Sequence, residues 1–219
     1  MKGNINIMFK NRQQKHRKMA SKFRLLASVG IAIVLFTGMG MVFSGKAALA
    51  DTIIPLNGSV NASTYIASLN TTANLPNGSF GGSVDLTNDQ ITGNLSLPAG
   101  SINTDVFGFV PMSATFEMVP VGSVTGTVDL KTLSVNVTSV FNIKLTSAEV
   151  FGLPFNIVGN QCETSTPVSA NLNGQVNSNL SVDLTGTYTI PSFENCGFST
   201  FLVNLLVPGS GNTITAQIS

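Results

Sequence analysis

The sequence predicts an all-β fold for residues 51–219, built as a single antiparallel β-sandwich, with a β-barrel as the alternative. Three observations predict this class. Apolar and polar residues alternate over long stretches, a short motif recurs, and turn-forming residues interrupt the chain at short intervals. Signals for helices are nearly absent, and the stretch is long enough for one domain with a buried core.

The clearest alternation runs through residues 133–145. Polar residues separate apolar ones of a single parity: Leu133, Val135, Val137, Phe141, Ile143 and Leu145. Successive side chains of a strand point to opposite faces, so this pattern predicts a strand with one buried face and one wet face.

A five-residue motif supports the β assignment. It occurs at residues 82–86, at 126–130 and, more weakly, at 180–184. Each of the first two copies is expected to enter a hairpin. A two-residue turn at 131–132 pairs Leu130 with Leu133, and a four-residue connection pairs Leu86 with Ile91.

Further strands and the turns between them follow from composition. Strands are predicted at residues 115–119, 168–172, 185–190, 201–207 and 213–218, the stretch 202–207 being a buried strand. Turns are predicted at residues 76–78, 98–100 and 208–212, where Pro, Gly and Asn gather.

Residues 1–50 have the organisation of a secretory signal peptide. The segment has three parts: a basic n-region (1–24), an uncharged h-region (25–43) and a cleavage site after Ala50. Because the uncharged run approaches the length that spans a bilayer, a retained anchor is the alternative. The initiating residue is Met1, Met8 or Met19. The sequence therefore predicts a protein that is secreted, extracellular or associated with the cell envelope.

Charge divides sharply between the two parts. Residues 51–219 hold all ten carboxylates and only two lysines, a formal charge of −8, with no Arg, His or Trp. This balance disfavours binding to nucleic acid. Without His there is no Ser-His-Asp triad, Cys-His pair or imidazole zinc site. We expect no catalytic, cofactor-binding or metal-binding residues and no cofactor.

Carboxylate chemistry of the glycosidase kind needs only two acidic residues, so a hydrolase remains a remote alternative. The candidates are Asp85, Asp129 and Asp183 from the recurring motif, and Glu117, Glu149, Glu163 and Glu194. The simpler interpretation places the motif aspartates on the solvent face of strands. Asp85, Asn88 and Asp89 are weaker candidates for calcium ligands, because the same residue types form turns for conformational reasons.

Cys162 and Cys196 are the only cysteines. An even number in an exported chain predicts a disulfide. A reactive thiol would need a neighbouring base or positive charge, and this part of the chain has no His or Arg to supply one. We therefore predict a structural bridge between them.

Two Phe-rich segments, residues 106–110 and 150–155, are broken by Gly and Pro. The commoner interpretation is loops that cap the core. The alternative is that they line a cavity or an exposed patch that binds lipid or another partner.

Residues 120–219 resemble a group of secreted β-rich proteins of Gram-positive bacteria, mainly actinobacteria, with no assigned activity. The segments that carry the resemblance are residues 141–147, 151–154, 159–162, 186–191, 195–197 and 205–209. The resemblance implies export, the disulfide and the β fold, and it implies no catalytic residue.

Together these features predict a secreted or envelope-associated, non-enzymatic protein with a structural or interaction role. The alternative is a binder of lipid or another hydrophobic small molecule. Envelope components or a hydrophobic ligand are the expected partners, and membrane contact is expected only through an uncleaved leader.

Overall fold

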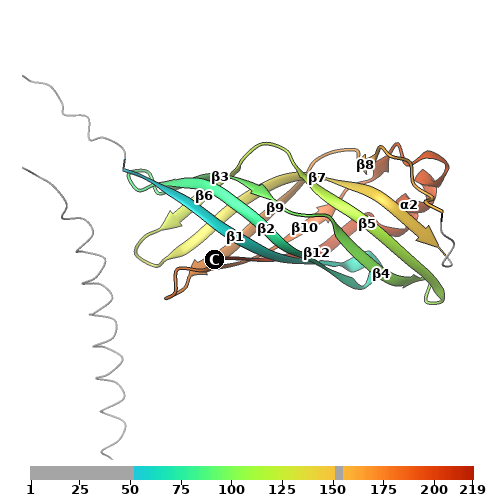
Figure 1. Ribbon diagram of the computed structural model, residues 1–219, viewed down its shortest axis with the longest axis horizontal. Coiled ribbons are helices and arrows are strands. Elements are labelled where there is room, and N and C mark those ends of the chain that lie inside the picture. The colour runs from blue at the N-terminus through green and yellow to red at the C-terminus, as the bar shows by residue number, and fades with distance from the viewer. Residues whose placement is uncertain (1–51, 151–154) are drawn as a thin grey trace, which may run out of the picture. The chain divides into compact units, whose positions relative to one another are not determined.

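The computed structural model describes residues 52–150 and 155–219, so the predicted signal peptide lies outside the described residues. Figure 1 shows the arrangement of the elements. The strands are β1 (Ile53–Ile66), β2 (Thr71–Asp85), β3 (Gln90–Ser96), β4 (Gly100–Val106), β5 (Val110–Pro120), β6 (Val124–Asp129), β7 (Ser134–Val150), β8 (Cys162–Thr164), β9 (Val168–Val176), β10 (Val182–Ile190), β11 (Phe193–Glu194) and β12 (Gly209–Ile218). The helical elements are η1 (Ala67–Leu69), η2 (Gly197–Ser199) and α2 (Thr200–Leu206).

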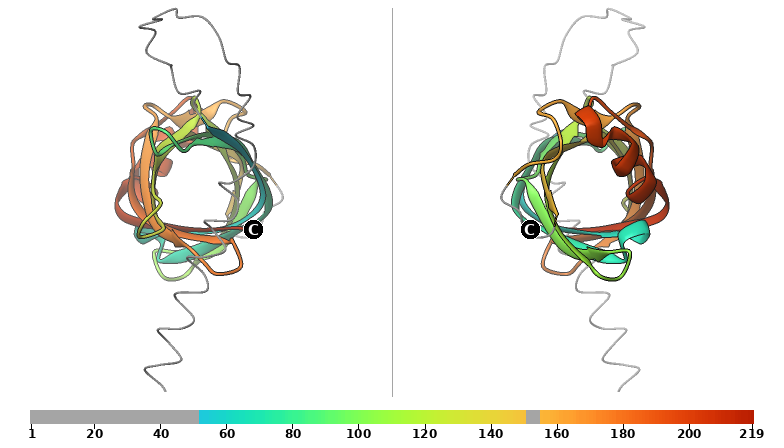
Figure 2. Two further views of the ribbon diagram at one scale, coloured as in Figure 1. Left: turned by 90° about the vertical axis from the view of Figure 1, so that its left-hand side faces the viewer. Right: turned by 90° about the vertical axis from the view of Figure 1, so that its right-hand side faces the viewer.

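The strands form one antiparallel sheet that closes on itself. Its order is β11-β8-β7-β6-β3-β2-β1-β12-β10-β9, and β7 also pairs with β9, from Ser134 opposite Gln175 to Phe141 opposite Val168. Viewed end-on, the sheet is a closed ring (Figure 2). The all-β prediction is confirmed. The architecture is the barrel alternative and not a sandwich, because the β7–β9 pairing joins the two ends of one sheet.

Strand β7 pairs with four other strands of the barrel. Its first half pairs with β6 and β9, and its second half pairs with β5 and β8, while β4 is paired to β5. Five of the six apolar residues that the alternation placed on one face are buried: Val135, Val137, Phe141, Ile143 and Leu145. The period of two therefore predicted the inner face of this strand correctly.

Two glycines allow the strands to approach one another closely. A Cβ added to Gly126 in β6 would collide with the carbonyl oxygen of Asn136, and one added to Gly174 in β9 with that of Asp183. Glycine within a strand often marks a position where another strand approaches closely, as strands do in a small closed sheet.

The recurring motif builds two matching hairpins. The first has a register that differs from the predicted one, and the second has the predicted register but its ladder ends one pair earlier. Asp85 pairs with Gln90, and Asp129 pairs with Ser134, so each loop has four residues and begins at the leucine of the motif. The Asp129 carboxylate accepts hydrogen bonds from the backbone N–H groups of Lys131 (2.7 Å) and Thr132 (3.3 Å). Aspartate favours such turns, so Asp85 and Asp129 are the last paired residues before the loops of their hairpins.

The predicted pairs Leu130–Leu133 and Leu86–Ile91 are consequently wrong. Leu130 and Leu133 lie in the turn and are exposed, and Ile91 pairs with Val84. The predicted pairing of Val128 with Val135 is confirmed.

Residues 76–78 are a bulge within β2 and not the predicted turn. Asn77 has a left-handed backbone (φ 61°), and the register with β1 shifts between Val60 and Ala62. Asn tolerates this conformation, and an extra residue bends the strand without ending it.

Residues 200–206 form α2 where the sequence predicted a buried strand. Only Val203 of this helix is buried, and Phe201 and Leu205 are exposed. None of the helices in the described ranges has the length and apolar character needed to cross a bilayer.

Candidate ligand-binding site

The main cavity lies inside the barrel at the end that carries α2 and the turn between β4 and β5. Its volume is about 180 Å³. The residues that form its wall and roof include Ile102, Val106, Ala114, Phe116, Ile143, Leu145, Ala148, Ile190, Leu202, Val203 and Leu206. Among the lining side chains that the structure describes, only Tyr188 carries a nitrogen or oxygen atom, so they form an apolar compartment.

Small residues in the barrel wall create this space. Ala114 of β5 lies directly opposite Ala148 of β7, and both line the cavity. A closed sheet fills its interior with inward side chains, so two alanines at paired positions leave volume that larger residues would occupy. The cavity follows from side-chain size at one register position.

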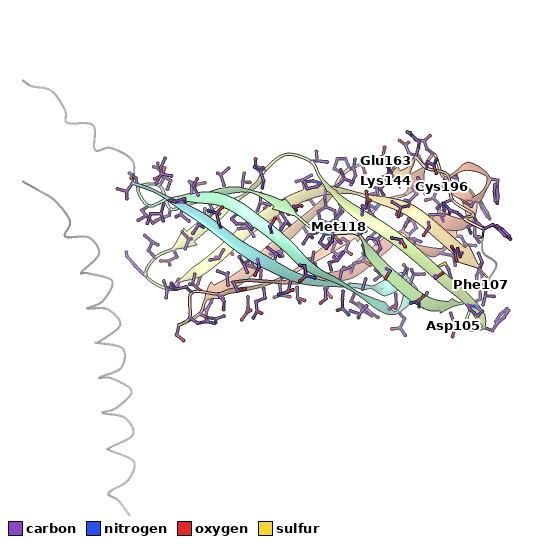
Figure 3. The ribbon with its side chains drawn as sticks, in the orientation of Figure 1. Asp105, Phe107, Met118, Lys144, Glu163 and Cys196 are labelled. Atoms are coloured by element: carbon purple, nitrogen blue, oxygen red, sulfur yellow. A yellow bond between two sulfur atoms is a disulfide. The ribbon has the colours of Figure 1, made fainter. Side chains whose placement is uncertain are left out.

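The floor of the cavity is formed near the middle of the barrel by Tyr188 and Met118 (Met118 is labelled in Figure 3). The Tyr188 ring packs edge-on against Phe141, with ring centroids 6.1 Å apart. Below the floor lies a smaller cavity of about 40 Å³. Phe141 lines this smaller cavity, and Met118 lines both cavities. Met118 thus separates two apolar spaces along the barrel axis.

A buried hydrogen bond fixes the floor. The hydroxyl groups of Tyr188 and Thr64 lie 2.6 Å apart, and Thr64 is 3.0 Å from the carbonyl oxygen of Thr213, to which it donates. With that donation made, Thr64 accepts from the tyrosine. Burial raises the pKa of Tyr188 above its ordinary value of 10.0.

Replacing Tyr188 with phenylalanine should change how stability depends on alkaline pH. Because the folded-state pKa is raised, the neutral phenol stabilises the fold fully below pH 10.0, and this contribution is lost as the pH rises through the folded-state pKa. At neutral pH, Y188F should lose about 1 kcal/mol, the worth of one hydrogen bond. Urea unfolding at neutral and alkaline pH measures both effects.

The matched control is Tyr65→Phe, which removes an exposed hydroxyl bonded to Asn70 and leaves Tyr188 in place. Y65F should keep the alkaline loss of the wild type, and Y188F should lose less stability than either above pH 10.0. An alkaline profile of Y188F equal to that of the wild type would contradict the assignment.

Helix α2 forms the roof, and two sets of interactions hold it in place. The predicted disulfide Cys162–Cys196 is present and joins β8 to the segment that leads into η2 and α2. Asn204 of α2 accepts a hydrogen bond from the backbone N–H of Phe193 (2.6 Å) and donates one to its carbonyl (2.9 Å). The disulfide is typical of a protein from an oxidising compartment.

The rim of the same end carries exposed apolar side chains. We call Phe107, Phe109, Phe198, Phe201 and Leu205 the apolar tip. Phe198, Phe201 and Phe109 are the most exposed, at 87%, 79% and 76%. The expectation that residues 106–110 cap the core is right for Val106 and Val110, which are buried, and wrong for Phe109, which is exposed. Phe107 is exposed and also lines the cavity. Residues 151–154 of the other Phe-rich segment lie outside the described residues.

None of the nine carboxylates in the described ranges is buried. Glu117 and Glu163 are the register partners of Lys144 on its two sides, and Figure 3 labels Lys144 and Glu163 side by side. Asp183 accepts hydrogen bonds from the side-chain amides of Asn177 (2.8 Å) and Gln217 (2.9 Å), which lower its pKa. Glu194 is exposed, and Glu149 lies on the outer surface beside Asp105.

The three calcium candidates stand in the first hairpin turn. Both Asp85 carboxylate oxygens are occupied: one accepts from the backbone N–H of Thr87 (2.8 Å), and the other from the Asn88 side-chain amide (2.7 Å). The bond from Asn88 contributes most to lowering the pKa of Asp85. Asp89 has a left-handed backbone (φ 55°) in the turn. Within the part of the chain that the structure describes, no three His, Cys, Asp or Glu side chains converge on a metal position.

The fold and the site together define a closed β-barrel with a roofed apolar cavity at one end. Comparison of the chain with protein-family models, with curated proteins and with solved structures gives no match.

Proposed function

We propose that this protein is exported and binds the hydrocarbon part of a lipid or another hydrophobic small molecule in the cavity beneath α2. The observation that carries the proposal is the cavity itself, which is lined by apolar side chains and roofed by a covalently tethered helix. The predicted leader and the resemblance to secreted proteins of Gram-positive bacteria support export. Catalysis has no part in the proposal, because none of the described residues that line the cavity carries a carboxylate.

An empty cavity of this size is unfavourable for a purely structural barrel. Fully enclosed apolar space costs roughly 24 cal/mol per Å³, so a hollow of this kind costs on the order of kilocalories per mole unless something fills it, against a small net stability of a single domain. An apolar ligand would offset that cost by restoring the missing contacts. This magnitude is our reason for preferring ligand binding to the structural role that ranks first from sequence alone.

The size and chemistry of the cavity define the class of ligand. An apolar cavity of about 150 Å³ in another protein holds benzene, whereas drug-sized pockets begin at about 300 Å³. The lining has no charged group, and its one hydroxyl, that of Tyr188, already bonds to Thr64. The enclosed part of the ligand is therefore a short hydrocarbon segment, and any headgroup stays outside.

A titration with unbranched 1-alkanols from hexanol to dodecanol tests the proposal. Burial of one CH₂ contributes about 0.8 kcal/mol, so Kd should fall about fourfold with each added carbon and then level off once the cavity is full. Isothermal titration calorimetry of the purified protein measures the series. Absence of saturable binding, or an affinity that rises steadily to dodecanol, would refute a cavity of defined length.

A further inference from the structure

We infer that the apolar tip is a docking surface for the hydrocarbon region of a lipid bilayer with electrically neutral headgroups. The tip stands at the end of the barrel where the cavity lies, on the turn between β4 and β5 and on η2 and α2 (Figure 1). Exposed apolar side chains gathered on one surface are typical of interaction sites. Exposure alone does not say what the partner is. The turn at Phe107 places one ring at this end, and the helix and the distribution of charge indicate the partner.

The first observation is the backbone at Phe107. Phe107 and Gly108 both have positive φ angles, 55° and 77°. Glycine tolerates this conformation, but for a bulky residue it is a rare and costly one. The exposed Leu133 and Leu180 have the same conformation in other hairpin turns, so the turn geometry explains how the Phe107 ring comes to lie at the end of the molecule. Figure 3 shows Phe107 at this end.

The second observation is the helix. Phe201 and Leu205 are four residues apart and share the outer face of α2, while Leu202, Val203 and Leu206 line the cavity. Phe198 precedes Phe201 by three residues and extends the outer row. The polar residues of α2 are Thr200 and Asn204, and Asn204 bonds to the backbone of Phe193, so the inner face and the outer row are both apolar and both need apolar surroundings. The barrel covers the inner face, and the outer face fits a hydrocarbon phase.

The third observation is charge. No charged residue occurs in residues 195–219 or 107–109, so the whole tip is uncharged. Asp105 and Glu149 flank one shallow depression on the outer surface, next to the β4–β5 turn. With only two lysines in residues 51–219, nothing at the tip attracts an anionic surface, and the nearby carboxylates oppose it. A neutral bilayer complements this distribution; a charged protein or an anionic membrane does not.

Docking at the tip would bring the cavity next to the membrane that holds its proposed ligand. Phe107 belongs to the tip and also lines the cavity, so the two surfaces are continuous. A hydrophobic ligand dissolves in membranes far better than in water, and docking places the cavity opening at that source. This part of the argument rests on the proposed function, whereas the docking itself is tested without any ligand.

The experiment is sedimentation of the protein, in the form its host produces, with phosphatidylcholine vesicles. The double variant F201S/L205S removes two exposed side chains that do not line the cavity. The matched control is Leu180→Ser, because Leu180 is 73% exposed, against 60% for Leu205, and lies in the turn between β9 and β10 at the opposite end of the barrel. Any contribution of the leader is common to all three proteins.

The wild type and L180S should bind the vesicles equally, and F201S/L205S should bind at least tenfold less, as expected from the loss of buried apolar area. High salt, at which the Debye length falls to ~3 Å, should not weaken binding. Phosphatidylglycerol vesicles at low salt should bind the wild type more weakly. Equal loss in both variants, or no loss in F201S/L205S, overturns the inference.

A dimer in gel filtration that F201S/L205S abolishes, without vesicle binding by the wild type, also overturns the inference and assigns the tip to a second copy of the chain. The alkanol titration separates this result from the proposed function. Neither Phe201 nor Leu205 lines the cavity, so F201S/L205S should bind alkanols in solution as the wild type does.

Discussion

Replacing Ala148 with leucine should reduce the affinity for 1-octanol by about 16- to 64-fold, the loss expected at about fourfold per methylene when a pocket is shortened by two or three methylene groups. Ala148 is buried, lines the cavity and lies opposite Ala114. The larger side chain would enter the space that the ligand is proposed to occupy. Because it fills an existing cavity, A148L should also unfold at the wild-type temperature or above. Calorimetric titration and thermal unfolding measure the two effects.

The matched control is the same substitution at Ala62, a buried alanine of β1 that lines the 40 Å³ cavity and not the main one. A62L should bind 1-octanol with wild-type affinity even if overpacking lowers its stability. Equal loss of binding in A62L and A148L would mean that binding reports general stability. Wild-type affinity in A148L would place the ligand elsewhere.

Removing the disulfide in the double variant C162A/C196A should lower the free energy of unfolding by roughly 3–4 kcal/mol. The bridge spans a sequence separation of 34, and a closed loop of that length restricts the unfolded chain by about this amount. Both cysteines are fully buried, so the loss of their sulfur atoms adds to the effect. Urea unfolding monitored by circular dichroism measures the difference.

The same double variant should bind alkanols more weakly than the wild type, because α2 would then be held chiefly by Asn204 and its own packing. Chemically reduced wild-type protein, which keeps both sulfur atoms, is the control for the cross-link. It should lose nearly as much stability as the double variant. Full stability after verified reduction would show that packing of the sulfur atoms, and not the covalent bond, stabilises the roof.

The predictions that succeeded from sequence depend on local chemistry. The period of two at Val135, Val137, Phe141 and Ile143 predicted the inner face of β7, because side chains of a strand alternate whatever the partner strand is. The pairing of the two cysteines needed only their number and an oxidising destination. Both inferences are independent of topology.

The end of the second hairpin ladder shows where a local pattern was insufficient. Apolar matching alone favours Leu130 opposite Leu133. The Asp129 carboxylate, however, bonds to two backbone N–H groups beyond it and ends the ladder one residue earlier. The preference of aspartate for turns was the available signal, and it outweighs one exposed pair of leucines.

Helix α2 and the cavity could not be predicted from the residues alone. The segment 200–206 has a short apolar sequence that fits a buried strand as well as a helix, and no side chain caps its first turn. Barrel closure depends on the long-range register of β7 with β9. The cavity depends on Ala114 meeting Ala148, and two isolated alanines give no signal until that register is known.

The central claim is that the ligand occupies the interior of the barrel, and intermolecular nuclear Overhauser effects between bound 1-octanol and the protein test it most directly. We predict contacts from octanol methylene protons to the methyl groups of Ala114, Ala148 and Leu145, which line the cavity. Contacts confined to Phe198, Phe201 and Leu205 would contradict the claim, because the alcohol would then bind only the outside of the tip.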